Sequence, residues 1–63
     1  MRTFSLYIDD DRYSVPTLMF VIARDEAKAK AIAKGQLAAS SHHLTVEVWE
    51  DGTLLSRVER ESN

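Results

Sequence analysis

Residues 17–23 read TLMFVIA and form the most apolar run in the chain. A strand on the surface of a small protein normally alternates apolar and polar residues, because successive side chains point to opposite faces of the sheet. This run does not alternate, so both of its faces need apolar cover. A chain of 63 residues has few elements, so the question is which segment or partner covers the second face of this strand. The run therefore bears on the fold and on where a partner binds.

Three further segments show the alternation expected of half-buried strands. The first places Phe4, Leu6 and Ile8 on one face. The last two are separated by Asp51-Gly52, a dipeptide that strongly indicates a hairpin, because a type I′ turn needs positive φ at both central positions. With the apolar run, the expected strands cover about residues 2–8, 17–23, 43–50 and 53–59.

A helix is predicted over about residues 25–39. Asp25 is a suitable N-cap, and the segment EAKAKAIAKGQLAA that follows is rich in strong helix formers. One face of the helix collects Ala29, Ile32, Ala33, Gln36 and Leu37. Gly35 weakens a helix interior, so an earlier end at this residue is the alternative to continuation.

The expected order is β-β-α-β-β in a single domain covering residues 1–63. The fold class is α+β, with a four-stranded, mainly antiparallel sheet and one helix on one face. Numbering the strands along the chain, the order 2-1-3-4 makes every pair antiparallel and is favoured. The alternative, 1-2-3-4, contains a central parallel pair with a right-handed crossover.

One helix covers only one side of this sheet, which divides the apolar residues into two sets. We expect the core side to hold Phe4, Leu6, Ile8, Leu18, Phe20, Ile22, Leu44, Val46 and Val48. The opposite, helix-free side is expected to hold Tyr7, Met19, Val21, Trp49 and either Leu55 or its neighbour Leu54. Large apolar residues of this kind on an uncovered face are typical of an interface. The predicted partner interface is Tyr7, Met19, Val21, Trp49 and Leu55.

Size and composition favour self-association. A chain this short has marginal stability unless disulfides, a metal or oligomerisation help, and this one contains no cysteine. We therefore expect a homodimer, or a complex with another protein, formed through the helix-free face or the strand at residues 17–23. The longest apolar stretch is far below the roughly 20 residues that a bilayer requires, and we expect no signal peptide, because an alternating strand pattern follows Met1-Arg2 at once. The expected location is the cytoplasm.

The candidate catalytic and metal-binding groups do not form convincing sites. Asp9–Asp11 are contiguous and lack the spacing of a calcium loop, so a solvated turn is the simpler interpretation. Adjacent His42 and His43 point to opposite faces and do not converge on a metal with Glu47 or Glu50. Ser40 and Ser41 beside His42 lack an oxyanion hole. We expect a non-enzymatic protein without cofactor, metal or catalytic residues.

Two other functions remain open. The expected helix carries Arg24, Lys28, Lys30 and Lys34, which form the alternative prediction, a nucleic-acid-binding module. The net charge of -2 and the neighbouring acidic residues weaken that alternative. The other possibility is a small-ligand site that is complete only at a dimer interface.

The segments RTFSLYIDDD, VIARDEAKAKAIA and LTVEVWEDGTLLSRV together cover most of the chain. Their combination is similar to small uncharacterised bacterial proteins with the order β-β-α-β-β. The resemblance implies the fold described above and a bacterial origin, and it implies no activity, cofactor or substrate.

Overall fold

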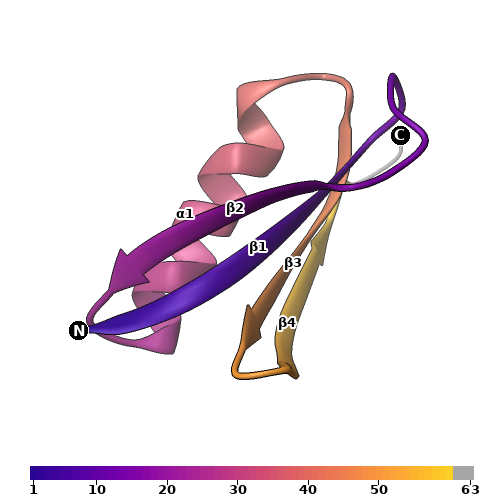
Figure 1. Ribbon diagram of the computed structural model, residues 1–63. Helices are drawn as coiled ribbons and strands as arrows, with labels where there is room; N and C mark the ends of the chain where they lie inside the picture. The colour runs from indigo at the N-terminus through magenta and orange to yellow at the C-terminus, as the bar shows by residue number, and fades with distance from the viewer. Residues whose placement is uncertain (61–63) are drawn as a thin grey trace.

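The first strand of the chain is an inner strand of the sheet. A computed structural model describes residues 1–60, with β1 (Arg2–Asp10), β2 (Thr17–Ala23), α1 (Glu26–Ala39), β3 (His43–Glu50) and β4 (Thr53–Glu59) (Figure 1). The four strands pair antiparallel in the order β2-β1-β3-β4. The predicted fold class and strand order are confirmed. Residues 61–63 of the predicted domain lie outside the described residues.

Helix α1 starts and ends as its sequence suggests. The side chain of Asp25 accepts a hydrogen bond from the backbone N–H of Lys28 at 2.9 Å, which satisfies one of the free donors of the first turn. The helix passes through Gly35 without interruption and ends before Ser40, whose backbone is extended. Ala29 and Ala33 are fully buried, so this face of the helix packs on the sheet.

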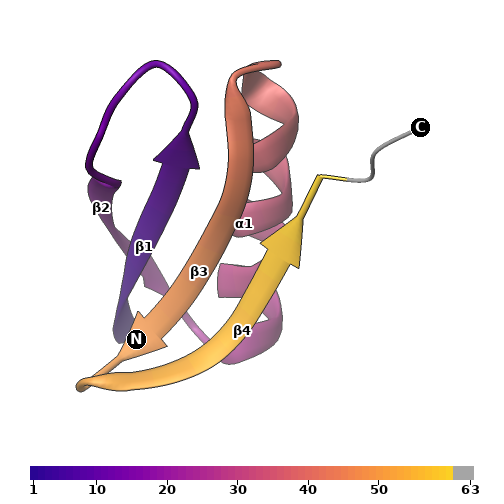
Figure 2. The same ribbon diagram turned by 90° about the vertical axis from the view of Figure 1, so that its right-hand side faces the viewer.

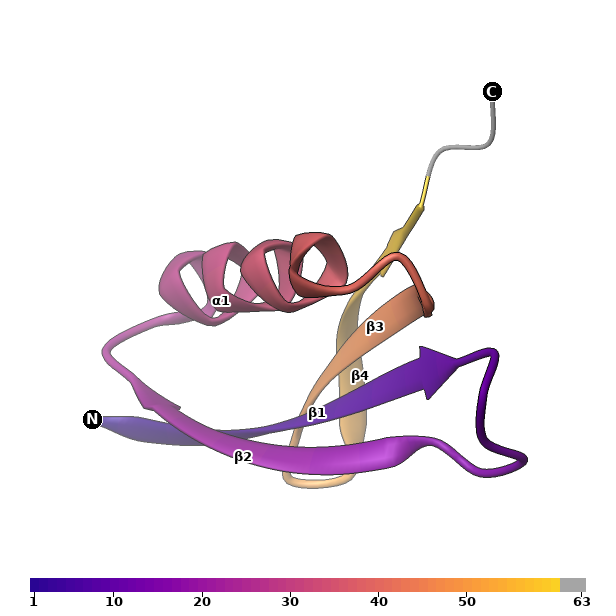
Figure 3. The ribbon, with the colours of Figure 1, turned by 90° about the horizontal axis from the view of Figure 1, so that it is seen from above.

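The helix covers one side of a strongly twisted sheet (Figures 2 and 3). The core consists of alternate residues from three strands and two helix alanines. Its members are Phe4, Leu6, Ile8, Val21, Ala23, Ala29, Ala33, Val46 and Val48. Small side chains at the helix allow its backbone to lie close to the sheet, which keeps the core tightly packed. Among residues 1–60, no further helix or strand covers the other side of the sheet.

Strand β2 faces the opposite way from the prediction. Phe4 pairs with Val21, and directly paired residues share a side of the sheet, so Met19, Val21 and Ala23 point toward the helix. Leu18, Phe20 and Ile22, which were predicted to be core residues, are exposed on the helix-free side. The prediction was wrong because an unbroken apolar run carries no alternation. Only the register, with Ile8 opposite Thr17, determines which side each residue takes.

A β-bulge reverses the two leucines of β4. Val48 pairs with Ser56 but Trp49 pairs with Leu54, so one additional residue of β4, Leu55, is inserted at this point. Leu55 is half-buried and packs against the core, whereas Leu54 is exposed beside Trp49 on the helix-free side. The placement of Leu55 on the helix-free side was therefore wrong. Leu44 also differs from the prediction, because it is exposed rather than buried.

The turn between β3 and β4 has the conformation that its sequence predicts. Asp51 has φ 50° and Gly52 has φ 78°, both in the left-handed region. Positive φ at both central positions is the requirement of a type I′ hairpin turn. The turn matches the right-handed twist of the strands and so holds β4 in register beside β3.

Candidate interaction surface

The helix-free side of the sheet is organised in rows that cross its strands. One row contains Phe20, Ser5, Trp49 and Leu54, and the next contains Leu18, Tyr7, Glu47 and Arg57. Residues paired in this way have neighbouring side chains on one face. Both rows begin with an apolar residue on β2, whereas on β4 one row ends in Leu54 and the other in Arg57. We call this whole surface the open face.

The β2 end of the open face is apolar and accessible. Leu18, Phe20 and Ile22 are 46%, 67% and 69% exposed, and all three lie on one edge strand. Tyr7 and Trp49, which were predicted to lie on this face, do lie on it, with Tyr7 exposed and Trp49 half-buried. A contiguous group of large exposed apolar side chains is typical of an interaction site. The sequence prediction placed Tyr7 and Trp49 on the side of the sheet where the structure has them, but it assigned the wrong residues of β2 to that side.

The outer edge of β2 is not protected by the usual devices. β2 pairs only with β1, so its outer backbone groups have no strand partner among the described residues. No charged residue occurs from Thr17 to Ala23, and Pro16 precedes the strand rather than interrupting it. Natural edge strands commonly carry lysine, proline or inward charges that prevent pairing with another chain. The β2 edge is therefore open to strand addition.

An aromatic cavity lies at the middle of the open face. The rings of Tyr7 and Trp49 are 6.0 Å apart between centroids and inclined at 78°, which is an edge-to-face arrangement. The indole Nε1–H of Trp49 donates to Oε1 of Glu47 at 2.9 Å. These three residues and Pro16 line a cavity of about 170 Å³. The sequence did not suggest Pro16 or Glu47, because they come together only through the pairing of β1 with β2 and β3.

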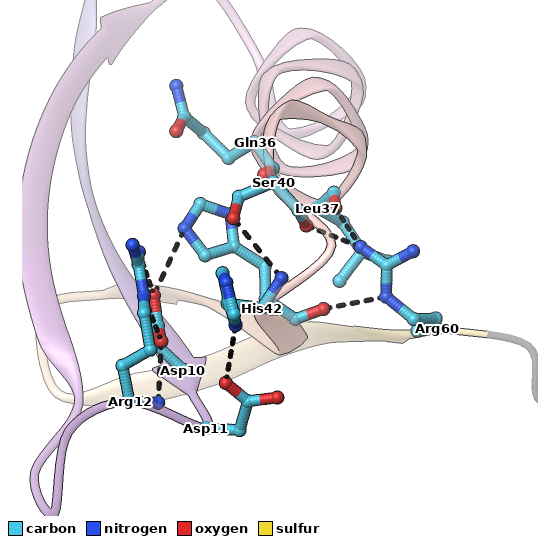
Figure 4. Close-up of polar contacts among 9 residues, drawn as sticks. Asp10, Asp11, Arg12, Gln36, Leu37, Ser40, His42 and Arg60 are labelled. Carbon is cyan, nitrogen blue, oxygen red and sulfur yellow. Dashed lines mark hydrogen bonds and ion pairs between the residues drawn. The ribbon is translucent and has the colours of Figure 1, made fainter.

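A buried carboxylate lies at the far end of β1, on the helix side. Asp10 is 3% exposed, and its oxygens accept hydrogen bonds from Arg12 Nε at 3.0 Å and Nη2 at 2.7 Å (Figure 4). The backbone N–H of Arg12 donates to it as well, at 2.8 Å. The hydrogen bonds from the Arg12 side chain hold the pKa of the Asp10 carboxyl far below its ordinary 3.8, although burial alone raises it.

The interpretation of Asp9–Asp11 as a solvated turn was therefore wrong for Asp10. β1 extends to this residue, and Asp10 follows the same alternation as Ile8 two residues earlier, so its inward position was readable from the period of two. Asp11 is exposed and lies 2.8 Å from Nδ1 of His42. The three carboxylates point to separate surroundings, which is incompatible with one shared cation.

Arg60, the last residue that the structure describes, contacts the C-terminal end of helix α1. The Arg60 guanidinium donates to the carbonyl oxygens of Leu37 at 2.8 Å and Ser40 at 2.5 Å, and its Nε donates to His43 O at 2.8 Å (Figure 4). The last carbonyls of a helix have no partner within the helix, so this contact satisfies them and places a positive charge at the negative end of the dipole.

The two histidines take separate structural positions. His43 is half-buried, with Nδ1 2.5 Å from Gln36 O and Nε2 3.6 Å from Asp10 Oδ2, whereas His42 is exposed and contacts Asp11. Among residues 1–60, no three His, Cys, Asp or Glu side chains gather in a group that could hold a metal ion. The contacts of His42 and His43 join the helix end to the β1 end.

The basic residues proposed for nucleic-acid binding are exposed, and they lie on helix α1 or just before it. Lys28, Lys30 and Lys34 are exposed, and Arg24 Nε lies 3.8 Å from Asp25 Oδ2. Glu26 adds a further negative charge in the first turn. The lysines are thus accessible, but the end of the helix nearest Arg24 has mixed charge. Within residues 1–60, no helix combines the length and apolar character needed to cross a membrane.

No family model matches this chain, and neither a curated protein nor a solved structure matches it. The functional argument therefore rests on the chemistry of the surfaces described above. Two features stand out among them: an unprotected apolar edge at β2, and an aromatic cavity with an adjoining carboxylate.

Proposed function

We propose that the protein is a small non-enzymatic interaction module that forms a homodimer by pairing the β2 edges of two copies. The observation that carries this proposal is the exposure of Leu18, Phe20 and Ile22 on an edge strand that has no charge of its own. Such a strand is a hazard for aggregation unless another chain covers it. A second copy is the simplest cover, because small domains gain stability from association.

The sequence of β2 suits a two-fold interface. If two β2 strands pair antiparallel about Phe20, Leu18 of one copy lies opposite Ile22 of the other, and Phe20 lies opposite its equivalent. Apolar residues then meet apolar residues along the whole strand, and the two open faces become continuous. An interface of this kind is isologous, which is the commonest arrangement in soluble homo-oligomers. Backbone hydrogen bonds between the strands supply directionality.

Sedimentation equilibrium at micromolar concentration tests the proposal. The unmodified chain is expected to be a dimer. Phe20→Lys places a charge at the centre of the interface and is expected to give a monomer. Leu54→Lys is the matched control, because it makes the same kind of change on the same face at the opposite edge, and it is expected to remain dimeric. A monomeric unmodified chain, or dissociation by Leu54→Lys alone, contradicts the β2 interface.

The alternative of nucleic-acid binding through Arg24, Lys28, Lys30 and Lys34 has weaker support. The net charge is -2, and acidic residues adjoin the N-terminal cation of this set. Binding through phosphates falls steeply with salt concentration. Absence of binding to duplex DNA at low salt removes this alternative.

The proposal also places the module in the cytoplasm of a bacterium. The chain contains no cysteine, which is compatible with a reducing compartment.

A further inference from the structure

We propose that the cavity formed by Tyr7, Pro16, Glu47 and Trp49 binds a methylated ammonium group. The site lies on the open face, on β1, β3 and the loop before β2, and its side chains come from segments that are far apart in the chain. It adjoins the proposed β2 contact but consists of other residues, because Tyr7 and Trp49 lie on the two inner strands and Pro16 precedes β2. Edge pairing through β2 uses none of the four residues that line the cavity.

The aromatic pair provides the first part of the argument. Tyr7 and Trp49 are nearly perpendicular, with centroids 6.0 Å apart, so the rings form a corner rather than a flat stack. The π-face of an aromatic ring attracts a cation, and tryptophan is the most effective of the aromatic side chains. The proline adds a third apolar wall. A group that is both cationic and apolar at its surface matches this lining.

Glu47 provides the charge. Its Oε1 accepts the indole N–H of Trp49, which fixes the carboxylate beside the rings. Its Oε2 forms an ion pair with Nε of Arg57 at 3.7 Å, a separation too long for a hydrogen bond, and the Glu47 side chain is 32% exposed. Within residues 1–60, Trp49 is the one hydrogen-bond donor to this carboxylate, so Glu47 retains capacity to attract a cation in the cavity.

The surrounding charges favour a cation as well. An adjoining cavity shares Tyr7 and Glu47 and is lined also by Asp9 and Arg57. Glu59 contacts Arg57, so the cation of this region is engaged by an acidic neighbour. Carboxylates thus outnumber guanidinium groups at this end of the open face. An anionic ligand meets repulsion here, whereas a cationic ligand is attracted.

Size and hydration indicate the kind of cation. At about 170 Å³ the cavity is smaller than the roughly 300–1,000 Å³ of pockets that hold drug-sized ligands, so it suits one head group. An unmodified lysine ammonium is strongly hydrated, and the Glu47 carboxylate and the Tyr7 hydroxyl are the only side-chain acceptors among the described residues of the lining, so most of its N–H donors would face apolar surface. Methylation replaces the N–H donors with apolar surface, which the rings and the proline accommodate. Either a free choline-like molecule or a methylated lysine side chain carries this chemistry.

Titration with choline tests the site, because Trp49 is the single tryptophan of the chain and its fluorescence reports directly on the cavity. We expect saturable binding with a dissociation constant in the millimolar range. The neutral isostere 3,3-dimethylbutan-1-ol is expected to bind about tenfold more weakly, because it lacks the charge. Equal binding of the two compounds, or no saturable response to choline, overturns the proposal.

Two substitutions test which side chains of the cavity bind the choline cation. Glu47→Gln and Tyr7→Leu are each expected to weaken choline binding about fivefold. Glu26→Gln and Tyr13→Leu are the matched controls, since both residues are exposed and lie outside the cavity, and they are expected to leave binding unchanged. Far-UV circular dichroism verifies folding. Unchanged binding in folded Glu47→Gln overturns the assignment, even if Tyr7→Leu does not fold.

The source of the cation is distinguished by comparing choline with a short peptide that contains trimethyl-lysine. Tighter binding of the peptide indicates a methylated side chain, and equal binding indicates recognition of the head group alone. Both results support the site. The oligomeric state of the same samples is recorded separately, so failure of the β2 dimer and failure of the cation site are told apart.

Discussion

Phe20 on β2 and Trp49 on β3 pair with the same residue of β1, Ser5, one from each side. Directly paired residues point to the same side of a sheet, so the two aromatic side chains lie in one row across the open face, with a small hydroxyl group between them. Trp49 also packs against Tyr7 of the next row. The apolar edge and the aromatic cavity are therefore adjoining parts of one surface.

The orientation of β2 predicts losses of stability of different size from truncating two neighbouring residues. Val21→Ala removes buried methyl groups and is expected to lower the free energy of unfolding by about 1–3 kcal/mol. Ile22→Ala changes a side chain that is mostly exposed and is expected to cost less than about 1 kcal/mol. Urea denaturation in the Phe20→Lys background measures both in the absence of the proposed dimer. A larger loss for Ile22→Ala contradicts the observed register.

Acid is expected to weaken the fold through Asp10. The pKa of Asp10 is lowered in the folded protein, mainly by the hydrogen bonds from Arg12, relative to the ordinary value of 3.8. The contribution to stability is therefore present above about pH 4 and is lost as the pH falls toward the folded pKa, because the unfolded chain takes up the proton first. Asp10→Asn is expected to flatten this dependence in denaturation curves at a series of pH values. Asp9→Asn retains Asp10 and is the control.

Arg60 is expected to stabilise the helix end through the geometry of its guanidinium group. Arg60→Lys keeps the charge but cannot donate to the carbonyls of Leu37, Ser40 and His43 together. A loss of about 1 kcal/mol in the free energy of unfolding is expected. Arg24→Lys is the control, because Arg24 makes one long contact with Asp25. If both variants lose the same free energy of unfolding, the carbonyl contacts of Arg60 do not contribute to stability.

The two glycines are expected to respond in opposite directions to alanine. Gly35 lies within the exposed part of the helix, and a Cβ there meets nothing within 4 Å. Gly35→Ala is therefore expected to raise the melting temperature, with a gain of about 0.5–1 kcal/mol. Gly52→Ala is expected to lower it, because Gly52 has φ 78° in the hairpin turn. Thermal unfolding followed by circular dichroism measures both.

The fold was predictable because several local signals agreed with one another. Alternation identified β1 and β3, Asp51-Gly52 located the hairpin, and Asp25 located the helix start. The directions of the strands left two orders open, and the favoured all-antiparallel order is the one observed. Agreement among propensity, pattern and turn chemistry is the mark of a sequence that specifies one fold.

The residues of the candidate site were only partly predictable. Tyr7 and Trp49 belong to strands with clear alternation, and they lie on the expected face. Met19 and Val21 were placed on the wrong face because the side that each β2 residue takes depends on the register with β1. Leu55 was misplaced because a bulge inserts a residue that no local pattern reveals. The cavity requires contacts among distant segments, which periodicity does not describe.

The inner position of β1 has a consequence for how the chain folds. β1 pairs with β2 through a short connection in the chain. Its other edge pairs with β3, so the contact of Ser5 with Trp49 joins residues that are far apart in the sequence. Contacts between distant residues form more slowly than local ones, because a long loop must close first. We therefore expect the N-terminal hairpin to form early and the C-terminal hairpin to dock last. Until it docks, an emerging polypeptide presents β1 as well as β2 to its neighbours, which makes synthesis the stage at which this protein is most exposed to misassembly.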